Sequence, residues 1–255
     1  MAVDLPGHGE SDDAHDGAYS LQGHARAVRA VVDALGLEDA CFLGWSLGGH
    51  VALEMAPDLP NARGFAIFGA PPLAFPPAME EAFLPDPALR LGFQESLDRA
   101  EAGAYVASFF RPGFTDVPAF FPGAALGFAF QPSLDREQAA AYVASFFRPG
   151  FADVPPFFLE DALRTDGRAR SGVAASIAPG GYRDEATVVR ELKTPLAVLH
   201  GAEEQLVNGA YFASLAMPTL WRGAVQTIAG AGHTPQWERP EPFDSLVTAF
   251  VEETV

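Results

Sequence analysis

Residues 44–49 read Gly44-Trp45-Ser46-Leu47-Gly48-Gly49. They follow a short apolar run, Ala40–Leu43, and open a helical pattern, His50–Met55. A serine inside Gly-x-Ser-x-Gly between a strand and a helix occupies a strained turn, so the residues two before and two after it must be small. The turn lifts the hydroxyl clear of the sheet, and the next backbone N–H, on Leu47, points toward a developing oxyanion. The spacing therefore predicts that Ser46 is a nucleophile.

Strand-like apolar runs alternate with helical patterns on both sides of this turn. A helix closed by Gly36 is predicted from steps of three and four at Leu21, Ala25, Val28, Val32 and Leu35. Further strands are predicted at residues 64–70, 196–201 and 225–229. Further helices are predicted at residues 47–59, at residues 211–216 and after His233. The last of these helices is expected to turn Phe243, Leu246, Val247 and Phe250 toward the core. This alternation predicts an α/β fold, a mostly parallel sheet with helices on both faces.

The pattern changes between the two halves of this predicted core. Residues 73–185 are rich in Phe, Pro, Ala and Gly with broken helical patterns. We therefore expect a core built from residues 1–72 and 186–255, with a helical cap inserted between two core strands.

The expected cap contains an internal repeat. Residues 94–121 recur as residues 131–158, and residues 104–114 reappear unchanged as 141–151. Two copies are too few for a solenoid, so a local tandem duplication is the better interpretation. Each copy is predicted to form one helix, capped at its start by Ser96 or Ser133 and stopped at Arg-Pro-Gly.

Composition excludes several classes of partner. The formal net charge is −17 and Lys193 is the only lysine, so nucleic acid and anionic membrane surfaces are unfavourable partners. No apolar run approaches 18 residues and no signal-peptide pattern is present, so a soluble, cytoplasmic protein is expected. Cys41 is the only cysteine, is expected to be a buried structural thiol, and forms no disulfide. The acidic cluster Asp12, Asp13 and Asp16 lacks a ligand scaffold, so no metal site is expected.

A serine nucleophile needs a base and the base needs a carboxylate, in the chain order Ser, acid, His. His233 follows the last predicted strand in a glycine-rich turn and is the predicted base. Glu203 and Glu204 both follow the strand that ends at Gly201; the spacing favours Glu204, with Glu203 as the alternative. The other histidines are assigned structural roles or none: His8, His15, His24, His50 and His200.

The motifs together resemble an α/β-hydrolase, and more narrowly the α/β-hydrolase-type N-acyl-homoserine lactonases, quorum-quenching enzymes with a Ser–His–Glu triad. The segments that carry the resemblance are Asp4-Leu5-Pro6-Gly7-His8-Gly9, Gly44 to His50, Thr165-Asp166-Gly167-Arg168-Ala169-Arg170, Leu220-Trp221 and Ala231-Gly232-His233. The resemblance implies that the first strands of the sheet and the upstream His-Gly oxyanion loop are missing from this chain. A missing oxyanion donor weakens transition-state stabilisation by about 3–4 kcal/mol, so weak activity is one expectation.

The sequence therefore predicts a cofactor-free serine hydrolase for a small-molecule ester or lactone. Ser46 is the nucleophile, His233 the base, Glu204 the orienting acid and the Leu47 N–H the oxyanion donor. The Phe-rich cap suggests an apolar acyl chain in the pocket, in keeping with an N-acyl-homoserine lactone. Acyl transfer or perhydrolysis through the same acyl-enzyme is an alternative, and an inactive truncated remnant is another. No oligomeric state is predicted.

Overall fold

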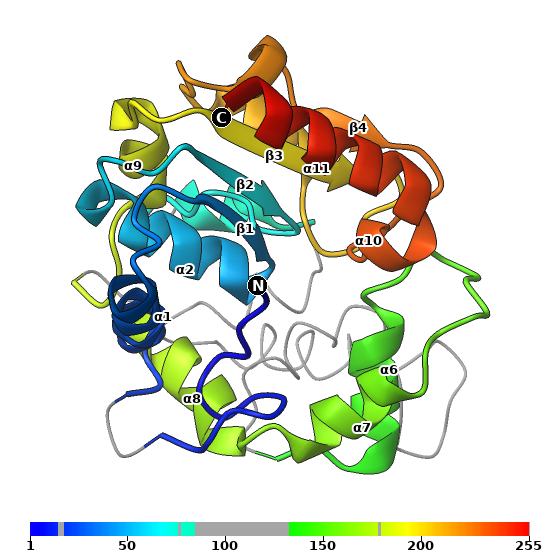
Figure 1. The fold of residues 1–255 in the computed structure, drawn as a ribbon. Helices are drawn as coiled ribbons and strands as arrows, with labels where there is room; N and C mark the ends of the chain where they lie inside the picture. Colours follow the sequence, from blue (N-terminus) through cyan, green and yellow to red (C-terminus); the bar gives the residue numbers. More distant parts are fainter. Residues whose placement is uncertain (15–17, 76–77, 85–132, 178–179, 255) are drawn as a thin grey trace, which may run out of the picture.

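The computed structural model describes residues 1–14, 18–75, 78–84, 133–177 and 180–254, and its fold is an α/β arrangement around a parallel sheet (Figure 1). Four strands pair in the order β1-β2-β3-β4, all parallel. Their bounds are β1 Cys41–Trp45, β2 Gly64–Phe68, β3 Leu196–Gly201 and β4 Gln226–Ile228. The three predicted strands and the strand of residues 41–45 are therefore confirmed, in the predicted parallel sense.

Helices connect the strands and cover the sheet. The α-helices are α1 Leu21–Leu35, α2 Leu47–Met55, α6 Arg136–Ala144, α7 Phe157–Arg164, α8 Gly167–Ser176, α9 Glu185–Glu191, α10 Pro235–Glu238 and α11 Pro240–Thr254. Short 3₁₀ helices are η1 Ala56–Asp58, η2 Ala78–Ala82, η4 Gly209–Ser214 and η5 Trp221–Gly223. No described helix combines the length and the apolarity that crossing a bilayer requires.

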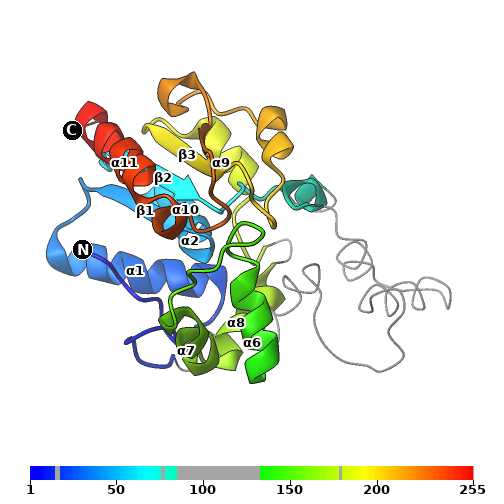
Figure 2. The ribbon, with the colours of Figure 1, turned by 90° about the vertical axis from the view of Figure 1, so that its right-hand side faces the viewer.

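The two faces of the sheet bury separate apolar clusters, as the alternation of side chains along a strand requires. In β2, Phe65 and Ile67 pack with α1, α2 and α9, whereas Ala66 and Phe68 pack with α11. On the α11 side, Phe243 and Phe250 are buried, and Leu246 and Val247 pack against the same cluster. Helices therefore cover both faces, as Figures 1 and 2 show.

Helices α6, α7 and α8 lie together beyond the end of the sheet at which β1 runs into α2 (Figure 2). They come from residues expected to form the cap. Helix α6 lies in the second repeat copy, whereas the first copy, with Ser96, lies outside the described residues.

Helix α6 differs from its prediction at both ends. Its N-cap is Asp135 rather than Ser133, because Asp135 and Gln138 form a capping box that satisfies two backbone N–H groups. The helix ends at Ala144, before the Arg-Pro-Gly sequence, and a turn follows. The backbone from residue 146 to 148 is thus free to make contacts outside the helix.

Several further expectations need correction. Leu35 is 55% exposed, since it lies in the last turn of α1 next to the Gly36 cap. Cys41 is half-buried, with its sulfur 3.5 Å from Thr254 Oγ1. The helix expected at residues 211–216 is the 3₁₀ helix η4, Gly209–Ser214.

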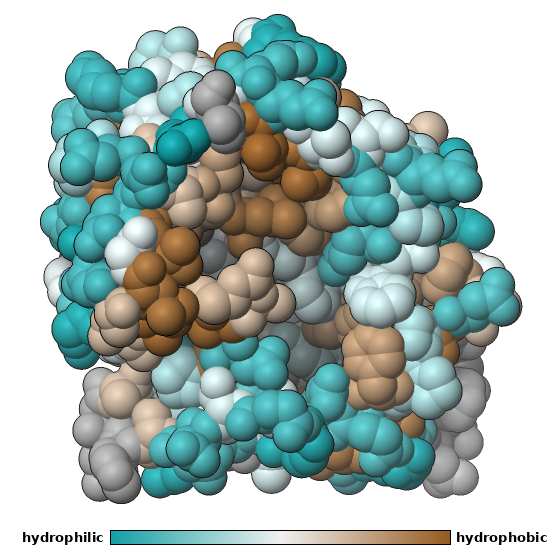
Figure 3. Space-filling model, viewed as in Figure 1, coloured by the Kyte–Doolittle hydropathy of each residue, from teal (hydrophilic) through white to brown (hydrophobic). Residues whose placement is uncertain are grey.

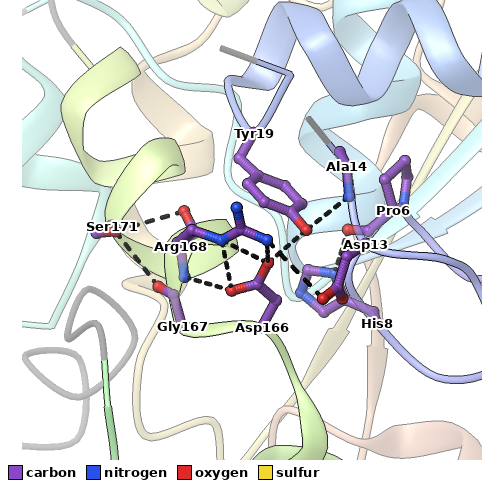
Figure 4. Close-up of polar contacts among 9 residues, drawn as sticks. All are labelled: Pro6, His8, Asp13, Ala14, Tyr19, Asp166, Gly167, Arg168 and Ser171. Carbon is purple, nitrogen blue, oxygen red and sulfur yellow. Dashed lines mark hydrogen bonds and ion pairs between the residues drawn. The ribbon is translucent and has the colours of Figure 1, made fainter. Parts of the chain in front are cut away.

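The N-terminal segment is fastened to α8 through the Asp166 carboxylate (Figure 4). Tyr19 donates its hydroxyl to Asp166 Oδ2 at 2.6 Å, and Arg168 Nε donates to the same oxygen at 2.9 Å. The hydrogen bonds from Arg168 and Tyr19 outweigh burial and lower the pKa of Asp166. Asp166 also caps α8 and donates its N–H to Gly7 O. Residues 165–170 therefore connect the N-terminal segment to the start of α8 through hydrogen bonds.

Strand β1 pairs with β2 on one side, and no described strand pairs with its other edge. Ala40 O and Ser46 N bond to the β2 side, so the backbone groups of residues 41, 43 and 45 face the open edge. Leu43, the middle residue of this strand, has a side chain that is 49% exposed.

Candidate active site

Ser46 occupies a strained turn between β1 and α2. Its backbone has φ 49° and ψ −119°, and only Arg222 shares a positive φ among the described non-glycine residues. The Ser46 N–H donates to Phe68 O at 2.9 Å, so the turn is tied to the end of β2. This is the conformation that the strand–turn–helix spacing predicts for an exposed nucleophile.

The two glycines of the motif have different reasons to be small. A Cβ on Gly44 would lie 2.4 Å from Gly48 O and 2.7 Å from Gly49 Cα, so position 44 admits only glycine. A Cβ on Gly48 would meet no atom within 4 Å. The expectation that both flanking positions must be small therefore holds at Gly44 alone.

His233 and Glu204 form a buried pair between the turns that follow β4 and β3. His233 Nδ1 and Glu204 Oε2 are 2.8 Å apart, and the two side chains are 3% and 2% exposed. The other carboxylate oxygen, Oε1, accepts from Leu206 N at 2.8 Å. With Nδ1 held by the carboxylate, the imidazole presents Nε2 on its opposite side.

The structure distinguishes the two candidate acids. Glu203 is exposed and its carboxylate accepts from Gly230 N at 3.1 Å, whereas Glu204 contacts His233. Burial alone would raise the pKa of Glu204, but the charge of His233 and the hydrogen bonds from His233 and Leu206 outweigh burial and lower the pKa. Glu204 is therefore held as the carboxylate that a neighbouring imidazolium needs.

His233 lies beside the serine turn. Its carbonyl accepts from Trp45 Nε1 at 2.8 Å, and the Trp45 and His233 rings are 5.9 Å apart. The ring also lies against Gly69, where a Cβ would approach His233 Cε1 to 2.7 Å. Nε2 is buried and has no hydrogen-bond partner among the described residues, so it forms no hydrogen bond with Ser46. An unpartnered base nitrogen next to a strained serine is an unusual and costly arrangement outside a functional site.

Leu47 is the first residue of α2, so its N–H has no partner within the helix. It donates to no other described residue. The Leu47 N–H is therefore without a partner among the described residues, and its role as oxyanion donor stays a prediction.

The sequence matches the family described as "alpha/beta hydrolase fold" over residues 1–240. The chain belongs to this family. The predicted α/β-hydrolase fold is thereby confirmed, and the family match together with the lactonase structures below supports a hydrolase enzyme. Among curated protein sequences, none matches the chain.

Solved α/β-hydrolases share the fold over nearly the whole chain. N-acyl homoserine lactonase AidH with bound N-butanoyl homoserine has 30% sequence identity and a TM-score of 0.77, covering 99% of this chain and 78% of that one. A variant of AidH with bound N-hexanoyl homoserine lactone has 29% identity and the same TM-score, with coverage of 99% and 79%. An esterase from Exiguobacterium antarcticum has 16% identity and a TM-score of 0.63, covering 98% and 80%, and shares the fold.

Aromatic side chains from distant segments of this α/β-hydrolase surround the histidine. Phe146, just after α6, lies 5.8 Å from the His233 ring and 5.7 Å from the Trp45 ring. Phe158 in α7 lies 6.1 Å from Trp45. Figure 3 shows this face hollowed between the end of β1, α10 and α6, with apolar atoms along part of the rim. Sequence reasoning missed Phe146 and Trp45, although the repeated Phe-Phe pair was a signal for the former.

The remaining histidines lie outside this arrangement. His50 Nδ1 is 2.9 Å from Glu185 Oε2, a buried carboxylate that also accepts from Leu73 N, so His50 joins α2 to α9. His8 Nδ1 lies 3.1 Å from Pro6 O, and burial lowers the pKa of His8. His24 and His200 have unpartnered buried nitrogens, and His15 lies outside the described residues. No cluster of metal ligands occurs in the described part of the chain.

Proposed function

We propose that this α/β-hydrolase is a serine hydrolase that opens a lactone ring or cleaves a carboxylic ester, with an N-acyl-homoserine lactone as the favoured substrate. One observation carries the proposal: a buried His233–Glu204 pair lies beside the strained Ser46 turn and leaves Nε2 of the imidazole without a partner. A base oriented by a carboxylate next to an exposed serine is the arrangement that acyl transfer to serine requires.

In the first half of the reaction, Ser46 Oγ attacks the carbonyl carbon of the substrate. His233 Nε2 takes the hydroxyl proton, and Glu204 stabilises the imidazolium that results. Negative charge develops on the carbonyl oxygen, where the free Leu47 N–H donates a hydrogen bond.

Collapse of this intermediate breaks the bond between the carbonyl carbon and the ring oxygen. The imidazolium gives its proton to that oxygen, so the ring opens and an ester to Ser46 forms. His233 then takes a proton from water, which attacks the ester carbonyl. Collapse of this second intermediate breaks the bond to Ser46 Oγ, the imidazolium returns its proton to that oxygen, and the open N-acyl homoserine is released.

The substrate class rests on the surroundings of the triad and on the related structures. Phe146 and Trp45 place an apolar wall against His233, which suits an acyl chain. AidH has been solved as a serine-to-glycine variant complexed with N-hexanoyl homoserine lactone and as a glutamate-to-glycine variant complexed with N-hexanoyl homoserine. Helices α6, α7 and α8 would form the cap over this substrate.

The test uses the purified full chain and its Ser46→Ala variant with N-hexanoyl homoserine lactone and p-nitrophenyl butyrate. Ring opening is followed by acid release and ester cleavage by absorbance, and a fluorophosphonate probe reports the reactivity of Ser46. We expect the parent to be labelled and active, and the variant to lose at least about a thousandfold in kcat. Equal rates in the two proteins would falsify the proposal. A parent that turns over esters but not lactones would restrict the proposal to esterase activity.

A further inference from the structure

The turn that carries His233 is bound to the backbone just after α6 by one buried carboxylate. Glu238, at the end of α10, accepts from Gly232 N at 2.7 Å through Oε2 and from Arg148 N at 2.7 Å through Oε1. Its side chain is completely buried. One carboxylate thus joins segments that lie 90 residues apart in the sequence.

Two further side chains fasten the same short segment. The Thr234 hydroxyl donates to Phe146 O at 3.1 Å and lies 3.2 Å from Glu238 Oε2. Gln205 Nε2, next to Glu204 in the chain, donates to Phe147 O at 2.6 Å. Three consecutive residues, 146 to 148, are therefore held by Thr234 in the histidine turn, Gln205 next to Glu204, and Glu238 at the end of α10.

The segment and the histidine turn are also in direct contact. A Cβ on Gly232 would lie 2.6 Å from Arg148 N and 2.8 Å from Phe147 C, so the two backbones touch. Gly232 and Thr234 flank His233, and both bind Glu238. Any shift of the Glu238 carboxylate therefore moves the turn on both sides of the imidazole, together with the Phe146 ring that packs on it.

We infer that Glu238 is a positioning residue of the hydrolase: its carboxylate fixes the His233 turn against residues 146–148 and so sets the imidazole and the Phe146 wall together. This inference rests on the proposed function. Glu238 touches no reacting atom, and it acts through the backbone of Gly232. Two backbone N–H groups, of Arg148 and Gly232, donate to its two oxygens, and the Thr234 hydroxyl lies 3.2 Å from Oε2; a carboxylate offers an acceptor on both oxygens.

The amide of glutamine has nearly the same shape but turns one acceptor into a donor, which would face a backbone N–H. Glu238→Gln therefore loosens the joint with the smallest change in volume. Glu241→Gln is the matched control, because Glu241 is exposed at the start of α11. Thr234→Val removes the hydroxyl that contacts Phe146 O and Glu238 Oε2, whereas Thr234→Ser keeps a hydroxyl at that position.

Steady-state kinetics on N-hexanoyl homoserine lactone or p-nitrophenyl butyrate, the rate of fluorophosphonate labelling of Ser46 and circular dichroism are measured for all variants. We expect Glu238→Gln to lower kcat and the labelling rate about 10–100-fold, as a displaced base would. KM should change less than kcat does, because Glu238 does not touch the substrate and affects its binding only through the Phe146 wall. Thr234→Val should lower kcat about 3–10-fold, and Thr234→Ser and Glu241→Gln should match the parent.

A folded Glu238→Gln variant with parental kcat and labelling rate would overturn the inference. If Glu238→Gln does not fold, the threonine pair decides: a slower Thr234→Val with a parental Thr234→Ser supports the inference, and parental rates in both overturn it. A parent that is inactive and unlabelled would overturn the proposed function, and this inference with it.

Discussion

At the scale of single residues, the site concentrates backbone conformations that are costly elsewhere. Ser46 adopts a positive φ, and Gly69, directly after β2, adopts φ 60° against the His233 ring. A non-glycine residue in such a conformation costs on the order of 1–3 kcal/mol. The strain therefore lies at Ser46, the proposed nucleophile, whereas Gly69 adopts its positive φ freely because it has no Cβ.

Exchange of Glu204 for glutamine removes the charge that orients and stabilises the His233 imidazolium. We expect Glu204→Gln to lower kcat by about 10²–10⁴-fold. Glu203→Gln is the control, because this neighbouring carboxylate is exposed and bonds to Gly230. Steady-state kinetics on N-hexanoyl homoserine lactone or an ester checks both; a greater loss from Glu203→Gln would reassign the acid.

Gly69→Ala should displace the His233 ring by direct steric contact. The added methyl would lie 2.7 Å from His233 Cε1, so the ring must move, and we expect kcat to fall at least about tenfold. Gly36→Ala has nearly the same φ, 63°, but meets no atom within 4 Å. It should cost only about 1–2 kcal/mol of the free energy of unfolding and leave kcat unchanged. Similar kinetics for the two variants would contradict this assignment.

The predicted site residues came from local patterns. Ser46 lies in a motif whose spacing fixes its conformation, and Glu204 and His233 follow predicted strands at the same edge of a parallel sheet. Glu238 and Phe146 were not predictable in this way. Their roles depend on a contact between α10 and the segment after α6, which no spacing along the chain encodes.

At the scale of elements, the junction of β1 and α2 is the most constrained part of the fold. Gly44, the fourth residue of β1, packs directly on the first turn of α2, and Gly49 packs on Ala70 after β2. The close approach brings the strand end and the helix start together, so the turn that carries Ser46 has little freedom to relax.

A pair of alanine substitutions tests this junction. Gly44→Ala places a methyl 2.4 Å from Gly48 O and should lower the free energy of unfolding by about 1–3 kcal/mol. Gly48→Ala adds a methyl to the first turn of α2 in open space and should raise it by about 0.5–1 kcal/mol. Urea unfolding followed by circular dichroism measures both. A destabilised Gly48→Ala would show that the turn has a different constraint.

The predicted helices agree with the structure where the apolar periodicity is long, and they differ from it at the helix ends. The helix of residues 21–35, with Gly36 at its C-cap, follows directly from its periodicity. At α6, both Ser133 and Asp135 are good caps, and Asp135 prevails because Gln138 lies three residues later. Leu35 fits the apolar period, but the helix ends there and nothing covers its side chain.

At the scale of the whole molecule, the burial of His24 makes the free energy of unfolding depend on pH. It is completely buried, both ring nitrogens lack partners among the described residues, and burial lowers its pKa to about 4. Protonation is thus favoured in the unfolded chain, where the pKa is near 6.5. Stability from this group is fully present above pH 6.5 and is lost as the pH falls through 4.

We expect the free energy of unfolding to drop by about 3 kcal/mol between pH 7 and pH 4 on account of His24 alone. His24→Leu removes the titration and keeps an apolar side chain. Urea unfolding at pH 7, 6, 5 and 4 should give a smaller decline for the variant, with the contributions of Glu204 and Asp166 common to both proteins. Parallel pH dependences would show that His24 does not carry the effect.

The open side of β1 bears on how the protein behaves in concentrated solution. Unsatisfied strand backbone next to an apolar side chain can template the addition of a foreign strand, and natural proteins commonly guard such sites with lysine. Leu43→Lys should therefore reduce light scattering on concentration more than Leu35→Lys, which alters a leucine of similar exposure, 55% against 49%, on a helix. Because one edge of β1 presents backbone N–H and C=O groups that no described strand pairs, residue 43 is the first choice for a substitution that improves solubility.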